Sequence, residues 1–114
     1  MLRSPCVVGL RWIMAYAKNS SYIPKLYETE NVPLEEKTIY QVYRIPSVGF
    51  YWLIAEYDPK EKTAFGYANL NDDDMAEWGY VSIDELEQNG AVLDTEWRPC
   101  SYREARRKIC EIEE

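Results

Sequence analysis

The sequence contains no histidine, the side chain that most often ligates metals and acts as a general base in enzymes. It has only three cysteines, Cys6, Cys100 and Cys110, an odd number without close spacing. This pattern argues against a disulfide framework and indicates a reducing cytoplasm. A nucleophilic cysteine would also lack the histidine that usually activates it. We therefore expect no metal site and no catalytic residue.

Long apolar runs are missing too, because no segment approaches the ~20 apolar residues that a membrane-spanning helix requires. The five glycines do not form a phosphate-binding loop or a nucleophile elbow. We therefore expect no cofactor and no membrane partner.

Positive charge is scarce through most of the chain. The range 21–97 carries 5 Lys/Arg against 16 Asp/Glu, and the whole chain has a net charge of −7. Such a surface repels phosphate backbones, so we expect no direct binding to nucleic acid. Two interpretations of the acidity stay open: a solvated surface, or one that mimics nucleic acid or binds a basic partner protein.

The first twenty residues differ from the rest. They superficially resemble a signal peptide, but Arg11 interrupts the apolar region. We expect 1–20 to be a weakly ordered leader or upstream segment, with Met14 as the natural start, and 21–114 to form a single domain.

Aromatic and β-branched runs separated by Pro, Gly and Asp predict strands over 38–45, 50–57, 62–70, 77–81 and 92–97. Capping boxes that begin at Ser82 and Ser101 predict a helix over 83–88 and a C-terminal helix over 101–112. The predicted class is α+β. We expect a mainly antiparallel four- to five-stranded meander sheet with the two short helices packed on one face.

Glu56 and Asp58 are two residues apart and would point to one face of an extended strand. Paired carboxylates perform acid–base chemistry when burial separates their pKa values, although Asp58 before Pro59 also suits a turn. A small metal-dependent or acid–base hydrolase centred on Glu56, Asp58 and Glu77 is therefore the alternative hypothesis. It requires the three carboxylates to converge in one pocket. The acidic run 72–74 does not fit the spacing of a calcium-binding loop.

The aromatic side chains are the strongest functional signal. Range 21–97 holds eight Tyr, three Trp and two Phe, which is more than a small core needs. They pack between sheet and helices, or some lie at the surface, where Tyr and Trp favour protein interfaces. The predicted binding residues are Trp52, Glu56, Tyr57, Asp58, Glu77, Trp78 and Tyr80.

These motifs resemble the family named domain of unknown function 2958. The similarity covers about 23–99, and its most specific piece is the run Glu77-Trp78-Gly79-Tyr80-Val81-Ser82. The chain departs from the family pattern at Val92-Leu93, where a charged Glu-Arg pair is expected. The resemblance implies a cytoplasmic protein of plasmids and other mobile elements, often encoded beside antirestriction genes. It implies no catalytic residues.

The sequence thus predicts a small acidic, non-enzymatic protein-interaction domain of mobile-element origin, related to antirestriction or counter-defence. Its expected partner is another protein, basic in the sharper version of this hypothesis.

Overall fold

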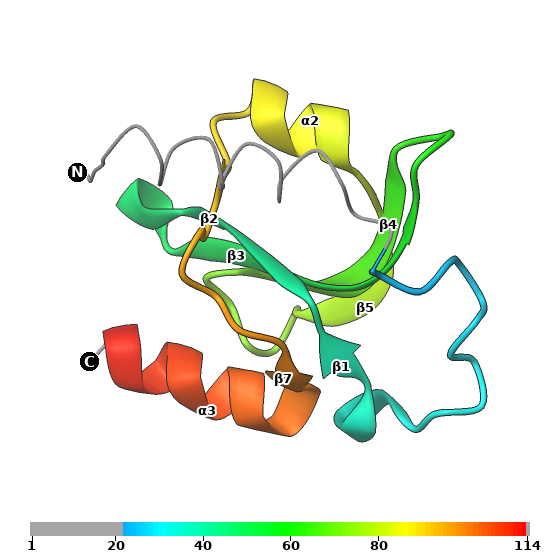
Figure 1. Cartoon of the computed structure of the whole chain (residues 1–114). Helices are drawn as coiled ribbons and strands as arrows, with labels where there is room; N and C mark the ends of the chain where they lie inside the picture. Colours follow the sequence, from blue (N-terminus) through cyan, green and yellow to red (C-terminus); the bar gives the residue numbers. More distant parts are fainter. Residues whose placement is uncertain (1–21, 114) are drawn as a thin grey trace.

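The computed structural model describes residues 22–113, and the side chains of residues 22–109. The predicted leader over 1–20 and the proposed start at Met14 lie outside the described residues. The core of the fold is an antiparallel sheet with strand order β5-β4-β3-β2-β6. Figure 1 labels the strands β2 to β5 of this sheet. Its strands are β2 (Gln41–Ile45), β3 (Phe50–Asp58), β4 (Thr63–Leu70), β5 (Glu77–Ser82) and β6 (Val92–Leu93). The predicted α+β class with an antiparallel sheet is confirmed.

Two of the predicted strands are shorter than expected. The range 38–45 divides at Tyr40 into β2 and β1 (Thr38–Ile39), and β1 pairs with β7 (Cys100–Ser101) in a separate two-stranded sheet. The range 92–97 keeps only the two residues of β6 as a strand. Short 3₁₀ helices, η1 (Leu34–Glu36) and η2 (Pro46–Val48), precede β1 and β3.

The two helices lie on opposite faces of the sheet, so the prediction that both pack on one face is wrong. Helix α2 (Ile83–Gln88) packs with Trp52 and Ile54, whereas α3 (Tyr102–Glu113) packs with Tyr51 and Leu53. In Figure 1 the helices stand above and below the sheet. The reason lies in β3, whose successive residues are all apolar from Phe50 to Ala55, so that both faces need a cover.

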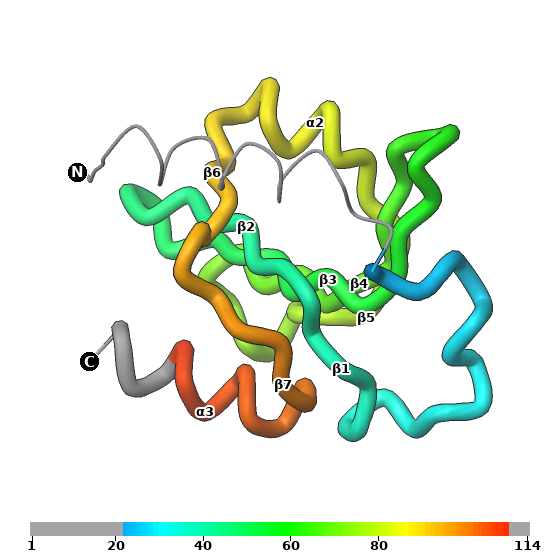
Figure 2. Tube along the Cα trace, viewed as in Figure 1, coloured from blue at the N-terminus to red at the C-terminus, as the bar shows by residue number. Residues whose placement is uncertain are grey.

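The chain changes sides after α2. Figure 2 shows it running from α2 through β6 to β7 and α3, past the edge of β2. The predicted capping serines fit these helix starts, because Ser82 Oγ accepts from the Glu85 amide and Ser101 Oγ accepts from the Glu104 amide. Among the described residues, no helix is both long and apolar enough to traverse a bilayer.

A β-bulge in β3 shapes one end of the sheet. Ile54 pairs with Gly66 and Glu56 pairs with Phe65, which leaves Ala55 without a partner on β4. Before the bulge, β3 is flanked by β2. After the bulge, the N-terminal loop (residues 22–37) lies beside β3 in place of β2. The Tyr57 amide donates to the Pro24 carbonyl at 2.9 Å.

Gly66 lies opposite the bulge, where the backbones of β3 and β4 approach closely. A Cβ on Gly66 would clash with the Leu53 carbonyl oxygen and lie 3.0 Å from the Leu53 carbonyl carbon.

We expect Gly66→Ala to lower the free energy of unfolding by about 2–3 kcal/mol, because backbone atoms of a central strand must shift. The measurement is urea denaturation. The control is Gly79→Ala on β5, where a Cβ meets nothing within 4 Å and the change should stay within about 0.5 kcal/mol. Equal effects of the two substitutions would contradict the close approach.

Burial of Tyr43 under α2, together with the nearby carboxylate of Glu87, raises its pKa from 10 to about 12. Between these two values the unfolded chain has lost the Tyr43 proton and the folded chain keeps it. The free energy of unfolding should therefore fall as the pH rises through this range, by at most about 3 kcal/mol. Measured by urea denaturation, the free energy of unfolding of Tyr43→Phe should fall less steeply with pH. Part of the pH dependence should remain, because the pKa values of Tyr57 and Tyr67 are also raised. An unchanged slope would contradict this assignment.

Candidate functional site

A pocket of about 370 Å³ opens between the N-terminal loop and the α3 face of the sheet. The sheet contributes one side chain from each of three neighbouring strands: Glu56 from β3, Phe65 from β4 and Tyr80 from β5. The loop contributes the rest of the lining: Tyr27, Glu30, Val32, Pro33, Leu34 and Lys37. The pocket therefore combines an aromatic and apolar wall with three charged groups.

The bulge places the Glu56 carboxylate in this pocket. Strict alternation would put Glu56 on the α2 face with Trp52 and Ile54. Because Ala55 is an extra residue, Glu56 instead pairs with Phe65 and shares its face. The bulge thus turns a carboxylate toward the N-terminal loop.

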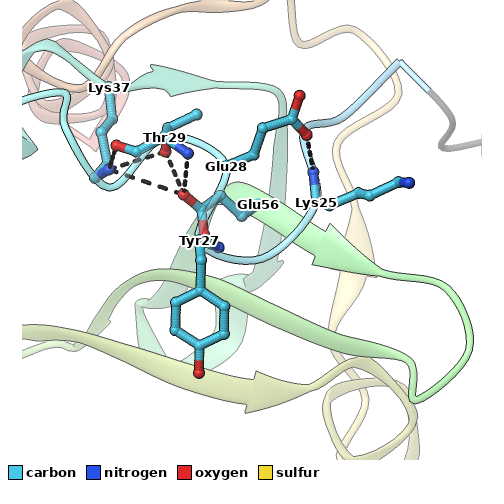
Figure 3. A network of polar contacts seen from close by, with 6 residues as sticks. All are labelled: Lys25, Tyr27, Glu28, Thr29, Lys37 and Glu56. Carbon is cyan, nitrogen blue, oxygen red and sulfur yellow. Dashed lines mark hydrogen bonds and ion pairs between the residues drawn. The ribbon is translucent and has the colours of Figure 1, made fainter.

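Glu56 is buried, with 3% of its surface exposed, and is held by a hydrogen-bond network shown in Figure 3. Its Oε1 accepts from the Tyr27 amide at 2.8 Å. Its Oε2 accepts from the Thr29 amide at 3.1 Å and from the Thr29 hydroxyl. The carboxylate therefore satisfies polar groups of the loop that would otherwise be buried without partners.

Lys37 supplies the counter-charge. Its Nζ lies 3.9 Å from Glu56 Oε2 and donates to both the carbonyl and the hydroxyl oxygen of Thr29. The ammonium also lies 5.9 Å from the centroid of the Phe65 ring. Both charged side chains are almost fully buried. The hydrogen bonds of both charged groups offset part of the desolvation cost of burying the pair.

Two tyrosines form the open side of the pocket. Tyr27 and Tyr80 expose 62% and 53% of their surface, and their ring centroids are 6.2 Å apart. A hydrogen bond with Tyr27 raises the pKa of the Tyr80 phenol. Tyr27 adopts a left-handed backbone with φ of 71°, uncommon for a residue with a side chain. The Glu56 carboxylate helps hold this conformation by accepting the Tyr27 amide proton.

Of the seven predicted binding residues, the structure brings only Glu56 and Tyr80 into this pocket. Trp52 is buried on the α2 face, and Tyr57 lies half-buried beside it. Trp78 is half-buried and stacks on Phe65, with centroids 5.5 Å apart.

Asp58 lies outside the pocket, and so does Glu77. Asp58 caps the turn after β3 by accepting from the Lys60 amide, and it lines a second pocket of about 440 Å³ with Lys25, Leu26, Tyr27, Pro59 and Lys60. Glu77 is exposed at the start of β5.

The carboxylates Glu56, Asp58 and Glu77 do not converge. Asp58 is in line with Thr63 and Ser82 across the sheet, whereas Glu77 is in line with Ala68. Ser82 lies five residue steps beyond Glu77 on β5, which is about 16 Å along the strand. The geometry that the hydrolase hypothesis required is therefore absent. Within the part of the chain that the structure describes, no three His, Cys, Asp or Glu side chains gather as a metal site would need.

Sequence reasoning missed several residues of the site: Tyr27, Thr29, Lys37 and Phe65. The prolines at 24 and 33 are the sequence signal that could have located this loop, because proline is typical of segments outside regular helices and strands. Nothing in the local sequence distinguishes Lys37 from the exposed charges before it. Its burial depends on a bulge in a strand nearly twenty residues away.

Comparisons with the models of protein families, with curated proteins and with solved structures found no match. The resemblance to domain of unknown function 2958 therefore stays a prediction, and the site is interpreted from its geometry.

Replacing Glu56 by Ala should lower the free energy of unfolding by about 3–5 kcal/mol, because the Lys37 ammonium would stay buried without a counter-charge. Urea denaturation measures this loss. Glu28 in the same loop is the matched control, since its carboxylate is exposed and accepts from the Lys25 amide. Glu28→Ala should cost at most about 1 kcal/mol.

The double variant Glu56→Leu with Lys37→Met removes both charges at once. It should recover part of the stability that Glu56→Ala loses, because apolar side chains of similar volume replace the pair. A loss under about 1 kcal/mol in Glu56→Ala would contradict the anchoring role of this carboxylate.

Proposed function

We propose that the protein is a non-enzymatic interaction domain that binds a segment of another protein at the pocket between the N-terminal loop and the sheet. The observation that carries this proposal is the contrast between the two sides of the pocket. Its open side presents exposed rings, and its polar floor is already hydrogen-bonded within the domain.

The open side has the chemistry of a recognition surface. Exposed apolar side chains, Val32 and Leu34, stand beside Tyr27 and Tyr80 around the cavity. Tyrosine is favoured at interfaces because it offers a large rigid contact area and a polar hydroxyl. A volume of about 370 Å³ is at the small end of the range for ligand pockets and suits one or two side chains of a partner.

The floor has the chemistry of a structural anchor. Glu56 accepts from Tyr27 and twice from Thr29, and Lys37 donates to both oxygens of Thr29. A general base must reach the proton that it abstracts, and here the acceptor positions of the carboxylate are engaged by the loop. This favours binding over the hydrolase alternative.

The distribution of charge favours a partner of opposite charge over mimicry of nucleic acid. Acidic residues lie at opposite ends of the sheet, with 72–74 after β4 and Asp58 and Glu61 in the turn after β3. Others lie on α2, which covers one face. Mimicry requires carboxylates spaced along one elongated face, and this arrangement does not follow that pattern. A basic protein surface fits it better.

The resemblance to domain of unknown function 2958, whose members are often encoded on mobile elements, suggests the cellular context of this proposal. We place the interaction in the cytoplasm, within the defence or counter-defence functions that plasmids and phages carry. The partner would then be a protein of such a system.

The test is co-purification from the native host with the wild-type chain, Tyr80→Ala and Met75→Ala as baits. Met75 is also an exposed apolar side chain, 74% exposed, and it is not among the residues that line the pocket. We expect a stoichiometric basic protein with the wild type and with Met75→Ala. Tyr80→Ala should weaken its binding by about 10–100-fold, as loss of a central aromatic contact does. Equal recovery by all three baits, or a bound metabolite or metal in place of a protein, would contradict the proposal.

A further inference from the structure

The outer edge of β5, next to the pocket, has backbone groups that pair with no other strand among residues 22–113. The Ile83 amide donates to the Lys62 carbonyl at 3.0 Å, and the antiparallel register continues from there without a shift. Because hydrogen-bonded and non-hydrogen-bonded pairs alternate, Val81, Gly79 and Glu77 direct their amides and carbonyls toward β4. Trp78 and Tyr80 direct theirs away from it.

No described strand pairs with this edge, since β5 is the terminal strand of the sheet order. Proteins usually protect such an edge with lysine, proline or a bulge, and β5 has none of these. Its centre is Gly79, where a Cβ would meet nothing within 4 Å. The opposite edge strand, β6, is only two residues long. The edge of β5 is therefore open to pairing with another strand.

The segment that contains β5 carries charge of one sign. The range 71–87 carries seven acidic residues and no lysine or arginine. Two of the seven are in ion pairs at 3.8 Å, Asp73 with Arg106 and Asp84 with Lys62. The remaining five are Asp72, Asp74, Glu77, Glu85 and Glu87. An incoming strand therefore gains electrostatic attraction if it is basic.

We infer that β5 accepts an extended, positively charged segment of the partner protein as an additional strand of the sheet. This inference rests on the proposed function, since it specifies how the partner binds at the same site. Main-chain hydrogen bonds to Trp78 and Tyr80 supply affinity in this mode of recognition. The partner side chain that lies opposite Tyr80, on the same face, stands within about 5 Å of it and at the rim of the pocket. The pocket then selects that side chain.

A second copy of the chain is a poorer occupant of the edge. Pairing of β5 with β5 would bring two acidic ranges together, and like charges placed opposite each other destabilise a sheet.

Gly79 allows a matched charge test. Gly79→Lys and Gly79→Glu both add a long flexible side chain at an open position, with opposite signs of charge. The probe is a short synthetic peptide in which lysine and valine alternate, compared with the same peptide carrying glutamate in place of lysine. We expect the lysine peptide to bind Gly79→Glu about tenfold more tightly than Gly79→Lys, and the glutamate peptide to bind neither well.

Amide hydrogen exchange gives the second readout. In the free protein the Gly79 and Val81 amides should exchange slowly and the Trp78 and Tyr80 amides quickly. Binding of the lysine peptide should protect Trp78 and Tyr80. Unprotected amides at these two positions, equal affinity of the two Gly79 variants, or protection by self-association without peptide would each overturn the inference. If the Tyr80→Ala bait still loses the native partner in any of these cases, the proposed function stands without strand addition.

Discussion

The pairing of Glu56 with the N-terminal loop is the interaction on which the site depends. One carboxylate accepts two backbone amides and a hydroxyl from residues 27–29, and its charge is balanced by Lys37 from the end of the same loop. Without it, the loop would have to bury polar backbone groups unsatisfied or leave the sheet. The pocket exists because the loop is held a fixed distance above β4 and β5, and the carboxylate fixes that distance.

A single inserted residue makes this interaction available. Ala55 moves Glu56 from the α2 face to the α3 face, and it bends β3 so that the N-terminal loop meets its last residues. Gly66 on β4 accommodates the close backbone approach opposite the bulge. The inserted residue and the glycine together make the irregular end of the sheet at which the pocket lies.

Much of the fold could be predicted from the sequence because its signals are local. Alternation of rings and β-branched residues marked β3, β4 and β5, and the serine caps marked both helices. The packing of the helices could not be predicted from helix sequence alone. It depends on the two-faced apolar character of β3, which required a cover on each side. The site was harder to predict than the fold. Trp52, Trp78 and Tyr80 are all aromatic residues of predicted strands, yet of these three only Tyr80 lines the pocket. Gly66 inside β4 is typical of a bulge or a close backbone approach, but it does not indicate which residue of the neighbouring strand is inserted. The direction of the Glu56 side chain was therefore not predictable.

The two-stranded sheet of β1 and β7 has a consequence for the integrity of the site. Lys37 immediately precedes β1, and its carbonyl accepts from the Tyr102 amide at 2.8 Å, at the start of α3. Helix α3 thus holds the end of the loop at Lys37, whereas Glu56 holds residues 27 and 29. Removing residues 100–113 would take away β7 and α3. The Lys37 carbonyl would then lose its hydrogen bond to the Tyr102 amide. The pocket near residue 27 is therefore completed by β7 and α3, so it takes its final shape only after these later elements have been synthesised.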